Sequence, residues 1–152
     1  RFSMLIKKDI TTIEKGVIMH QVNCQDVMGA GVAKAIYLKH PAVKESFHKL
    51  AKQETYNTPK KRFGLVQPVK INEQLIVLNS FSQLYYGRNK NIKYTDENAL
   101  IKNLKKLDIY AKERNLPAYV PEKIGCNLAN GDWNKIKDFI EKETDITIVS
   151  WK

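Results

Sequence analysis

Residues 16–22 (GVIMHQV) constrain the fold of this chain more than any other segment. The segment is mostly apolar, which is typical of a strand that a sheet buries on both faces. A glycine-containing loop follows it, then a helical pattern over 31–40 that Pro41 ends or bends. A buried strand that passes directly into a helix predicts an α/β protein.

Strand-like and helix-like segments alternate along the rest of the chain. We expect further strands at 4–6, 63–70, 75–80, 118–121 and 146–150, and further helices at 41–54, 96–115 and after Asp132. Residues 72–73 predict the turn of a hairpin. Thr95 and Asp132 are the expected N-caps of the last two helices, since short polar side chains accept hydrogen bonds from a first turn. The pattern predicts one domain over 4–151 with a central mixed, largely parallel sheet.

Composition excludes several classes of protein. The chain has 152 residues, the length of one domain, and its two cysteines and three scattered histidines provide neither a disulfide framework nor the ligand spacing of a zinc site. No apolar run approaches the roughly 20 residues that cross a bilayer, and no signal peptide is visible. We therefore expect a cytoplasmic monomer without metal, cofactor or membrane partner. Residues 1–3 are expected to be vector-derived, with Met4 as the native start.

The charge balance is strongly basic. Lysine and arginine together number 26, aspartate and glutamate 16, and the formal net charge is +10. This surplus favours anionic partners such as nucleic acid, nucleotides or phosphorylated metabolites. A solvated basic surface is the alternative.

Two glycine loops lie where predicted strands end. In the first, residues 23–33, Gly29 and Gly31 allow a ligand close to the backbone, and the following helix start offers free amides. The third glycine of a dinucleotide fingerprint would fall on Lys34, and no Gly-Lys-Ser/Thr follows, so the loop is neither that fingerprint nor a P-loop. A simple packing turn is the alternative.

The second loop, residues 124–133, contains Gly125 and Gly131, with Asn127 and Asn130 as residues that tolerate positive φ. Such a loop allows consecutive amides to point at one anion. Ligands of open α/β sheets bind at the carboxyl ends of the strands. Two such loops at one crevice predict a ligand with a diphosphate group.

Three short motifs occur in an order and spacing that match one family. They are Asp9-Ile10, Val22-Asn23-Cys24 leading to residues 28–33 (MGAGVA), and Ile124-Gly125-Cys126. With them the chain resembles a macrodomain, the ADP-ribose-binding module, from Met4 to Trp151. His20 and the end of the second loop at Trp133 make it most similar to the branch of ADP-ribose 1''-phosphate phosphatases and terminal ADP-ribose glycohydrolases. The resemblance implies a three-layer α/β/α fold.

The resemblance also implies roles for particular residues. Asp9 would accept a hydrogen bond from the adenine amino group beside the Ile10 amide, and Asn23 would hold ribose hydroxyls. Phe81, with Ser82 and the segment near Tyr85, would wall the adenine or ribose. Backbone of the two loops would hold the diphosphate and crowd the distal ribose: Gly29, Ala30, Gly31 and Val32 in the first loop, and Gly125, Cys126, Asn127, Leu128, Ala129 and Asn130 in the second.

Each of these residues has a structural alternative. Asp9 could start a turn, His20 could be a hydrogen-bonded core residue, and Cys24 and Cys126 could be small buried residues. Asp132 is best explained as a helix cap.

The chain also departs from the family. Asn127 and Asn130 occupy positions where the family often has glycine. Phe81 lies where some glycohydrolases carry a lysine, and their acid falls at Ala129. The sequence therefore does not support a covalent lysine mechanism.

From the sequence we favour an ADP-ribose-binding protein that hydrolyses a group from the terminal ribose. That group is a phosphate, as in ADP-ribose 1''-phosphate processing, or a link to ADP-ribosylated protein or nucleic acid, and His20 or Asn23 would orient the attacking water. One alternative is a reader that binds ADP-ribose without turnover, which the missing lysine and acid favour. Another is a basic nucleic-acid-binding protein, although no motif of that class is present.

Overall fold

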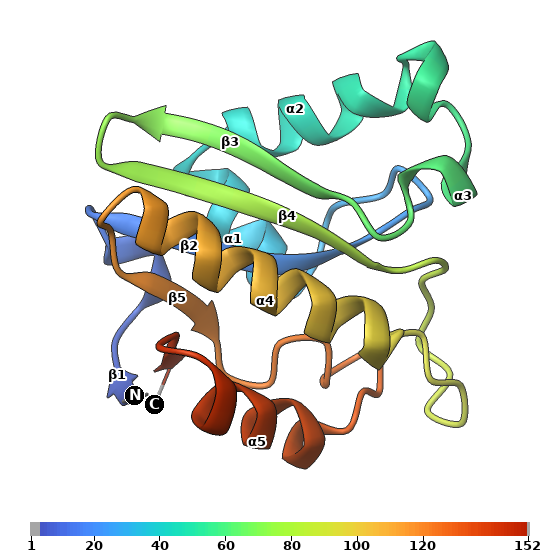
Figure 1. Cartoon of the computed structure of the whole chain (residues 1–152). Coiled ribbons are helices and arrows are strands. Elements are labelled where there is room, and N and C mark those ends of the chain that lie inside the picture. The colour runs from blue at the N-terminus through green and yellow to red at the C-terminus, as the bar shows by residue number, and fades with distance from the viewer. Residues whose placement is uncertain (1–3, 152) are drawn as a thin grey trace.

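The computed structural model of the chain describes residues 4–151 (Figure 1). The expectation that residues 1–3 derive from a vector lies outside the described residues. Six strands form one sheet in the order β1-β6-β5-β2-β4-β3. Their bounds are β1 Leu5–Lys7, β2 Gly16–Asn23, β3 Val66–Asn72, β4 Leu75–Gln83, β5 Ala118–Pro121 and β6 Thr147–Ser150.

The sheet is mixed and largely parallel, as the sequence predicts. β2 lies near its centre, and it pairs in parallel with β4 on one side and β5 on the other. β3 runs antiparallel to β4 as the first arm of the predicted hairpin. β2 is buried along most of its length, which explains why it is apolar in sequence.

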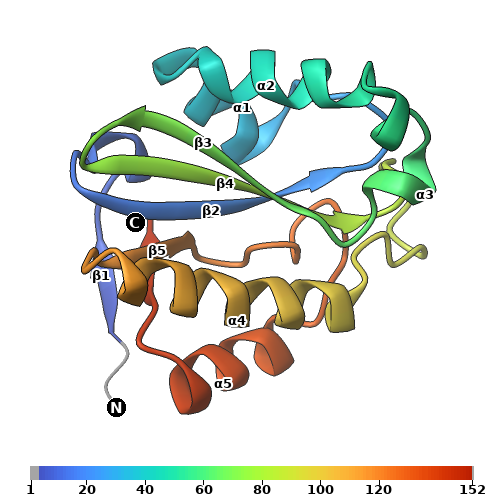
Figure 2. The ribbon, with the colours of Figure 1, turned by 45° about the horizontal axis from the view of Figure 1, so that its top comes forward.

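Helices cover both faces of the sheet, so the fold has the three expected layers (Figure 2). α1 (Gly31–Lys39) and α2 (Ala42–Ala51) pack on one face, and α4 (Glu97–Glu113) and α5 (Trp133–Glu143) on the other. Each face of the sheet has its own hydrophobic core, and successive residues of β2 point to opposite faces. Ile18 packs in the core on the side of α1 and α2, and Met19 packs in the core on the side of α4 and α5. Within residues 4–151, no helix is both long and apolar enough to cross a membrane.

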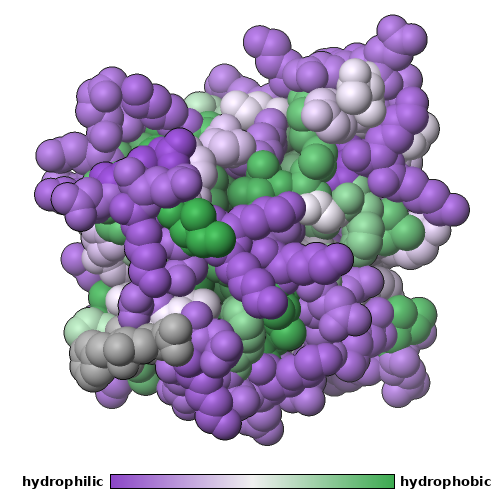
Figure 3. Space-filling view, in the orientation of Figure 1, coloured by the Kyte–Doolittle hydropathy of each residue, from purple (hydrophilic) through white to green (hydrophobic). Residues whose placement is uncertain are grey.

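The outer face of α4 and α5 is mostly hydrophilic (Figure 3). Lys102, Lys105 and Lys106 are exposed on α4, while Leu104 and Leu107 of the same helix are buried. This helical spacing of apolar residues is the pattern that predicts α4 in the sequence.

The segment before β3 differs from its prediction. β3 begins at Val66 rather than at residue 63, because a short helix, α3 (Pro59–Arg62), and a turn come first. α2 ends at Ala51, and two 3-10 turns, Ile10–Thr12 and Glu54–Tyr56, complete the helical elements that the structure describes. The local signal for α3 is Pro59 at its first position, which is typical of a helix start, but the basic run Lys60-Lys61-Arg62 that follows shows no apolar periodicity.

The predicted cap of α4 is wrong by one residue. Asp96 is the N-cap, and its carboxylate accepts a hydrogen bond from the Ala99 amide at 3.0 Å. Thr95 is buried, and its hydroxyl donates to the Gly125 carbonyl instead. The predicted cap of α5 is confirmed, because Asp132 accepts from the Lys135 amide at 3.3 Å.

Candidate ligand-binding site

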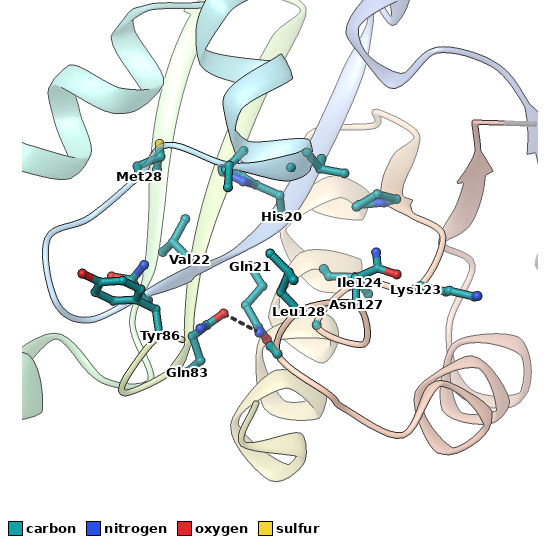
Figure 4. A pocket seen from close by; sticks show the side chains of 18 of the residues that line it. His20, Gln21, Val22, Met28, Gln83, Tyr86, Lys123, Ile124, Asn127 and Leu128 are labelled. Atoms are coloured by element: carbon teal, nitrogen blue, oxygen red, sulfur yellow. Dashed lines mark hydrogen bonds between the residues drawn. The ribbon is translucent and has the colours of Figure 1, made fainter. Parts of the chain in front are cut away.

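A cavity of about 700 Å³ opens at the carboxyl ends of β2, β4 and β5 (Figure 4). The chain leaves β2 toward α1 on one face of the sheet and leaves β5 toward α5 on the other. A cavity between two such strands is where α/β sheets bind ligands. Its walls come from three segments: the β2–α1 junction, residues 83–88 and residues 121–129.

The first glycine loop forms one wall, and it leaves backbone open to the cavity. A Cβ at Gly29 or Gly31 would meet nothing within 4 Å, and Gly31 has φ +59°, which favours glycine. α1 begins at Gly31 without a side-chain cap. The amides of its first turn, including that of Val32 on the cavity wall, are therefore free of a capping side chain.

Side chains from three elements hold this loop in place. Asn23 donates to the Val27 carbonyl at 2.6 Å and accepts from the Gln25 amide at 2.9 Å. Buried Arg62 of α3 donates to the Cys24 carbonyl, and His48 of α2 contacts the Asp26 carboxylate at 2.6 Å. The Asn23 side chain thus supports the shape of the loop while it also lines the cavity.

The second glycine loop is packed more tightly than the first. A Cβ at Gly125, where φ is +71°, would lie 2.8 Å from Gln21 Oε1, and one at Gly131 would lie 2.5 Å from the Gly125 carbonyl oxygen. Asn130 has positive φ as predicted, but Asn127 does not. Packing within the protein therefore requires these two glycines whether or not a ligand binds.

A polar network that the sequence did not reveal supports the base of the cavity. Gln21 Nε2 donates to Gln83 Oε1 at 2.9 Å (Figure 4). It also donates to Thr95 Oγ1 at 2.8 Å, and Gln21 Oε1 accepts from Ser82 Oγ at 2.7 Å. Thr95 in turn donates to Gly125, so the network joins β2 and β4 to the second loop. The one signal in the sequence is that polar residues follow the apolar parts of both strands.

Residues 84–94 link the two loops across the cavity mouth. The Tyr86 amide donates to Gln25 Oε1 at 2.9 Å in the first loop. From the second loop, Asn130 Nδ2 donates to the carbonyls of Asn89 and Ile92 at 3.0 and 2.6 Å. Tyr86 and Arg88 line the cavity from this segment, and exposed Lys123 lines it from the second loop.

His20 belongs to β2 and lies on the cavity wall, close to the start of α1. It is buried, and its Nε2 atom lies 2.6 Å from Asn79 Oδ1. Burial lowers the pKa of His20 to about 4, although the hydrogen bond to Asn79 opposes this shift. The imidazole is therefore neutral at neutral pH.

Most of the predicted site residues meet at this cavity. Those that line it are His20, Asn23, Gly29, Ala30, Gly31, Val32, Gly125, Asn127, Leu128 and Ala129. Asp9, Ile10, Phe81, Cys126 and Asn130 are not among its lining residues.

Three of these other residues have structural roles. Asp9 caps the first 3-10 turn, where it accepts from the Thr11 amide and hydroxyl at 2.9 and 2.7 Å, and these bonds lower the pKa of its carboxyl. Ile10 is buried in the core. Phe81 does not wall the cavity: it is fully buried and stacks on Phe47 with ring centroids 5.7 Å apart.

The two cysteines are poorly suited to nucleophilic chemistry. Burial raises the pKa of both the Cys24 and Cys126 thiols to about 12, so neither is a thiolate at neutral pH. Within residues 4–151, no group of three or more His, Cys, Asp or Glu side chains could hold a metal ion.

No family model and no curated protein matches the chain. Among solved structures, a protein of unknown function from Bacteroides thetaiotaomicron is 26% identical, with a TM-score of 0.81 over 97% of each chain. The macrodomain of Mycobacterium tuberculosis DarG is 16% identical, with a TM-score of 0.74 over 98% of this chain and 97% of that one. A mutant Oceanobacillus iheyensis macrodomain, solved with ADPR, is 17% identical, with a TM-score of 0.65 over 97% of this chain and 84% of that one.

The strand order and the helices on both faces define a three-layer α/β/α protein, with a cavity at the carboxyl ends of its strands. The chain has the macrodomain fold, as the three sequence motifs predict.

Proposed function

We propose that this protein binds ADP-ribose in the cavity at the ends of β2 and β5 and hydrolyses a group from its terminal ribose. The observation that carries the proposal is the first glycine loop. There the uncapped start of α1 borders a cavity of about 700 Å³, and Gly29 and Gly31 leave their backbone open to it. Free amides at a helix N-terminus favour an anion.

The charge of the site fits a diphosphate. Arg88 and Lys123 line the cavity together with a single carboxylate, Glu122, which accepts a hydrogen bond from Ser150 at 2.9 Å. The chain as a whole carries a net charge of +10. The ADPR complex of the Oceanobacillus macrodomain supports ADP-ribose as the particular ligand.

Hydrolysis would rest on positioning rather than on a protein nucleophile. Water would attack the phosphorus of a 1''-phosphate, or the anomeric carbon of an ADP-ribosyl link to protein or nucleic acid. The bond to the leaving group would break, and the leaving group would take up a proton. Asn23 and His20 are the candidates that hold this water, because both line the cavity and carry polar atoms.

A reader that binds without turnover is the second candidate, and particular observations favour it. The Asn23 side chain is engaged by its own loop, and Ala129, which lines the cavity, offers no acid. Glu122 is the one carboxyl group among the lining residues, so a leaving group would depart with little assistance from a carboxylic acid.

Two measurements test the proposal. Calorimetric titration of the wild type with ADP-ribose should show binding at one site per chain, and absence of heat would contradict the proposal. Phosphate release from ADP-ribose 1''-phosphate, and release of ADP-ribose from modified protein and nucleic acid, then separate enzyme from reader. We expect slow turnover that falls more in Asn23→Ala than in His20→Ala. Binding without release of any product would identify a reader.

A further inference from the structure

Behind the cavity wall, a chain of side-chain hydrogen bonds leads from His20 to α2. His20 Nε2 lies 2.6 Å from Asn79 Oδ1. Asn79 Nδ2 donates to Gln67 Oε1 at 3.0 Å, and Gln67 Nε2 donates to the Ser46 carbonyl at 2.9 Å. Asn79 Nδ2 also lies 3.4 Å from the carbonyl of Val43. The chain therefore ends on backbone oxygens of α2.

These backbone oxygens fix the direction of every bond in the chain. A carbonyl can only accept, so the Gln67 amide group must point its nitrogen at Ser46 and its oxygen at Asn79. Asn79 must then donate to Gln67 and present its own oxygen to His20. Neutral His20 can satisfy that oxygen only as a donor. Its proton is therefore on Nε2, and Nδ1 carries a lone pair.

The Nδ1 atom is buried and has no hydrogen-bond partner within residues 4–151. His20 itself is 1% exposed and lines the cavity, and its ring points toward the start of α1 (Figure 4). A buried acceptor without a donor costs free energy, and a ligand that supplies a donor removes this cost. The geometry thus leaves a fixed, unpartnered acceptor on a residue of the cavity wall.

We propose that His20 Nδ1 accepts a hydrogen bond from a sugar hydroxyl of the bound ligand, and that Asn79 and Gln67 are positioning residues that set the tautomer of His20. This inference rests on the ADP-ribose function proposed above and deepens it. A hydroxyl on Nδ1 occupies the one free ring nitrogen of His20, which leaves Asn23 as the candidate that holds the attacking water. The diphosphate of ADP-ribose is fully ionised at neutral pH and carries no proton, so it cannot satisfy Nδ1. His20 Nδ1 therefore favours a hydroxyl group of the ligand, while the free amides at the start of α1 favour its phosphates.

Nitrogen NMR of the histidine ring tests the tautomer directly. We expect the wild type to show its ring proton on Nε2 and a bare Nδ1. Asn79→Leu should give a mixture of tautomers. Asn103→Leu is the matched control, since Asn103 is also a buried asparagine but bonds to Ser80 Oγ and the Leu65 carbonyl instead. If Asn79 has only a structural role, both variants should lose stability and neither should change the tautomer of His20. A proton on Nδ1 in the wild type would overturn the inference even if Asn79→Leu fails to fold.

Titration with ADP-ribose tests the hydroxyl contact. We expect the Nδ1 resonance of the wild type to shift on binding, and His20→Phe to bind ADP-ribose about 3- to 10-fold more weakly, the range for one neutral hydrogen bond. If ADP-ribose binds while the Nδ1 resonance stays in place, this inference fails and the proposed function stands. If ADP-ribose does not bind the wild type at all, the proposed function fails and the hydroxyl contact fails with it.

Discussion

Gly29 and Gly31 lie two positions apart but are glycine for different reasons. At Gly31 the backbone has φ +59°, so any side chain there is strained whether or not a ligand binds. At Gly29 the structure gives no positive φ, and an added Cβ would meet nothing within 4 Å. The fold itself therefore tolerates a side chain at 29, and only a ligand in the cavity would exclude one.

This difference makes Gly29→Glu a sharp probe of the cavity. The glutamate adds bulk and a negative charge where the phosphates are expected, so we predict that ADP-ribose binding is abolished while the melting temperature stays near that of the wild type. Leu38→Glu is the control, because Leu38 lies on α1, the helix that follows this loop, and is 67% exposed and outside the cavity lining. Thermal melts with and without ADP-ribose measure both effects. A full ligand shift in Gly29→Glu would exclude this loop as the phosphate site.

Burial of His20 predicts how stability depends on pH. Its pKa falls from 6.5 to about 4 on folding, so between these values the unfolded chain binds a proton that the folded chain does not. Stability from this residue is fully present above about pH 6.5 and decreases as the pH falls toward 4, by on the order of 3 kcal/mol. Urea unfolding of wild type and His20→Gln at both ends of this window should show a smaller loss in the variant. Equal losses would contradict the assignment.

At the scale of elements, two neighbouring residues at the start of α4 should separate stability from binding. Asp96→Ala removes the cap and should lower the free energy of unfolding by about 1 kcal/mol without weakening ADP-ribose binding. Thr95→Val keeps the cap but removes the hydroxyl that joins Gln21 to Gly125, so it should weaken binding. Chemical denaturation and calorimetry on both variants measure the two effects. Unchanged affinity in Thr95→Val would mean that the network is not needed for the site.

How far each element could be predicted depends on how local its determinants are. β2, α1 and the β3–β4 hairpin follow from apolar runs, glycines and turns that are adjacent in sequence. The network around Gln21 does not, because its partners Gln83 and Thr95 lie 62 and 74 residues away. The resemblance to macrodomains implied that Phe81 walls the ligand, but β4 stays buried as far as Ser82. The glycine-loop residues that line the cavity could be predicted because the loop and its exposed backbone are the same local feature.

At the scale of the whole molecule, the surplus of positive charge should make binding depend on salt. ADP-ribose is anionic, and exposed Arg88 and Lys123 lie at its expected site. Binding should weaken as the salt concentration rises, and Arg88→Gln should reduce this dependence. Lys105→Gln on the outer face of α4 is the control and should leave the dependence unchanged. Calorimetry at low and high salt checks the prediction, and a salt-independent affinity would contradict it.

The three walls of the cavity come from segments spread over more than half of the chain, and residues 84–94 join them through Gln25 and Asn130. The cavity is therefore complete only once the last of these segments has docked. A ligand that needs all three walls has little affinity for a partly folded chain, so it should stabilise the native state without stabilising the folding transition state. In stopped-flow experiments, saturating ADP-ribose should slow unfolding and leave the refolding rate unchanged. Faster refolding with ligand would mean that the site assembles early, before the rest of the sheet.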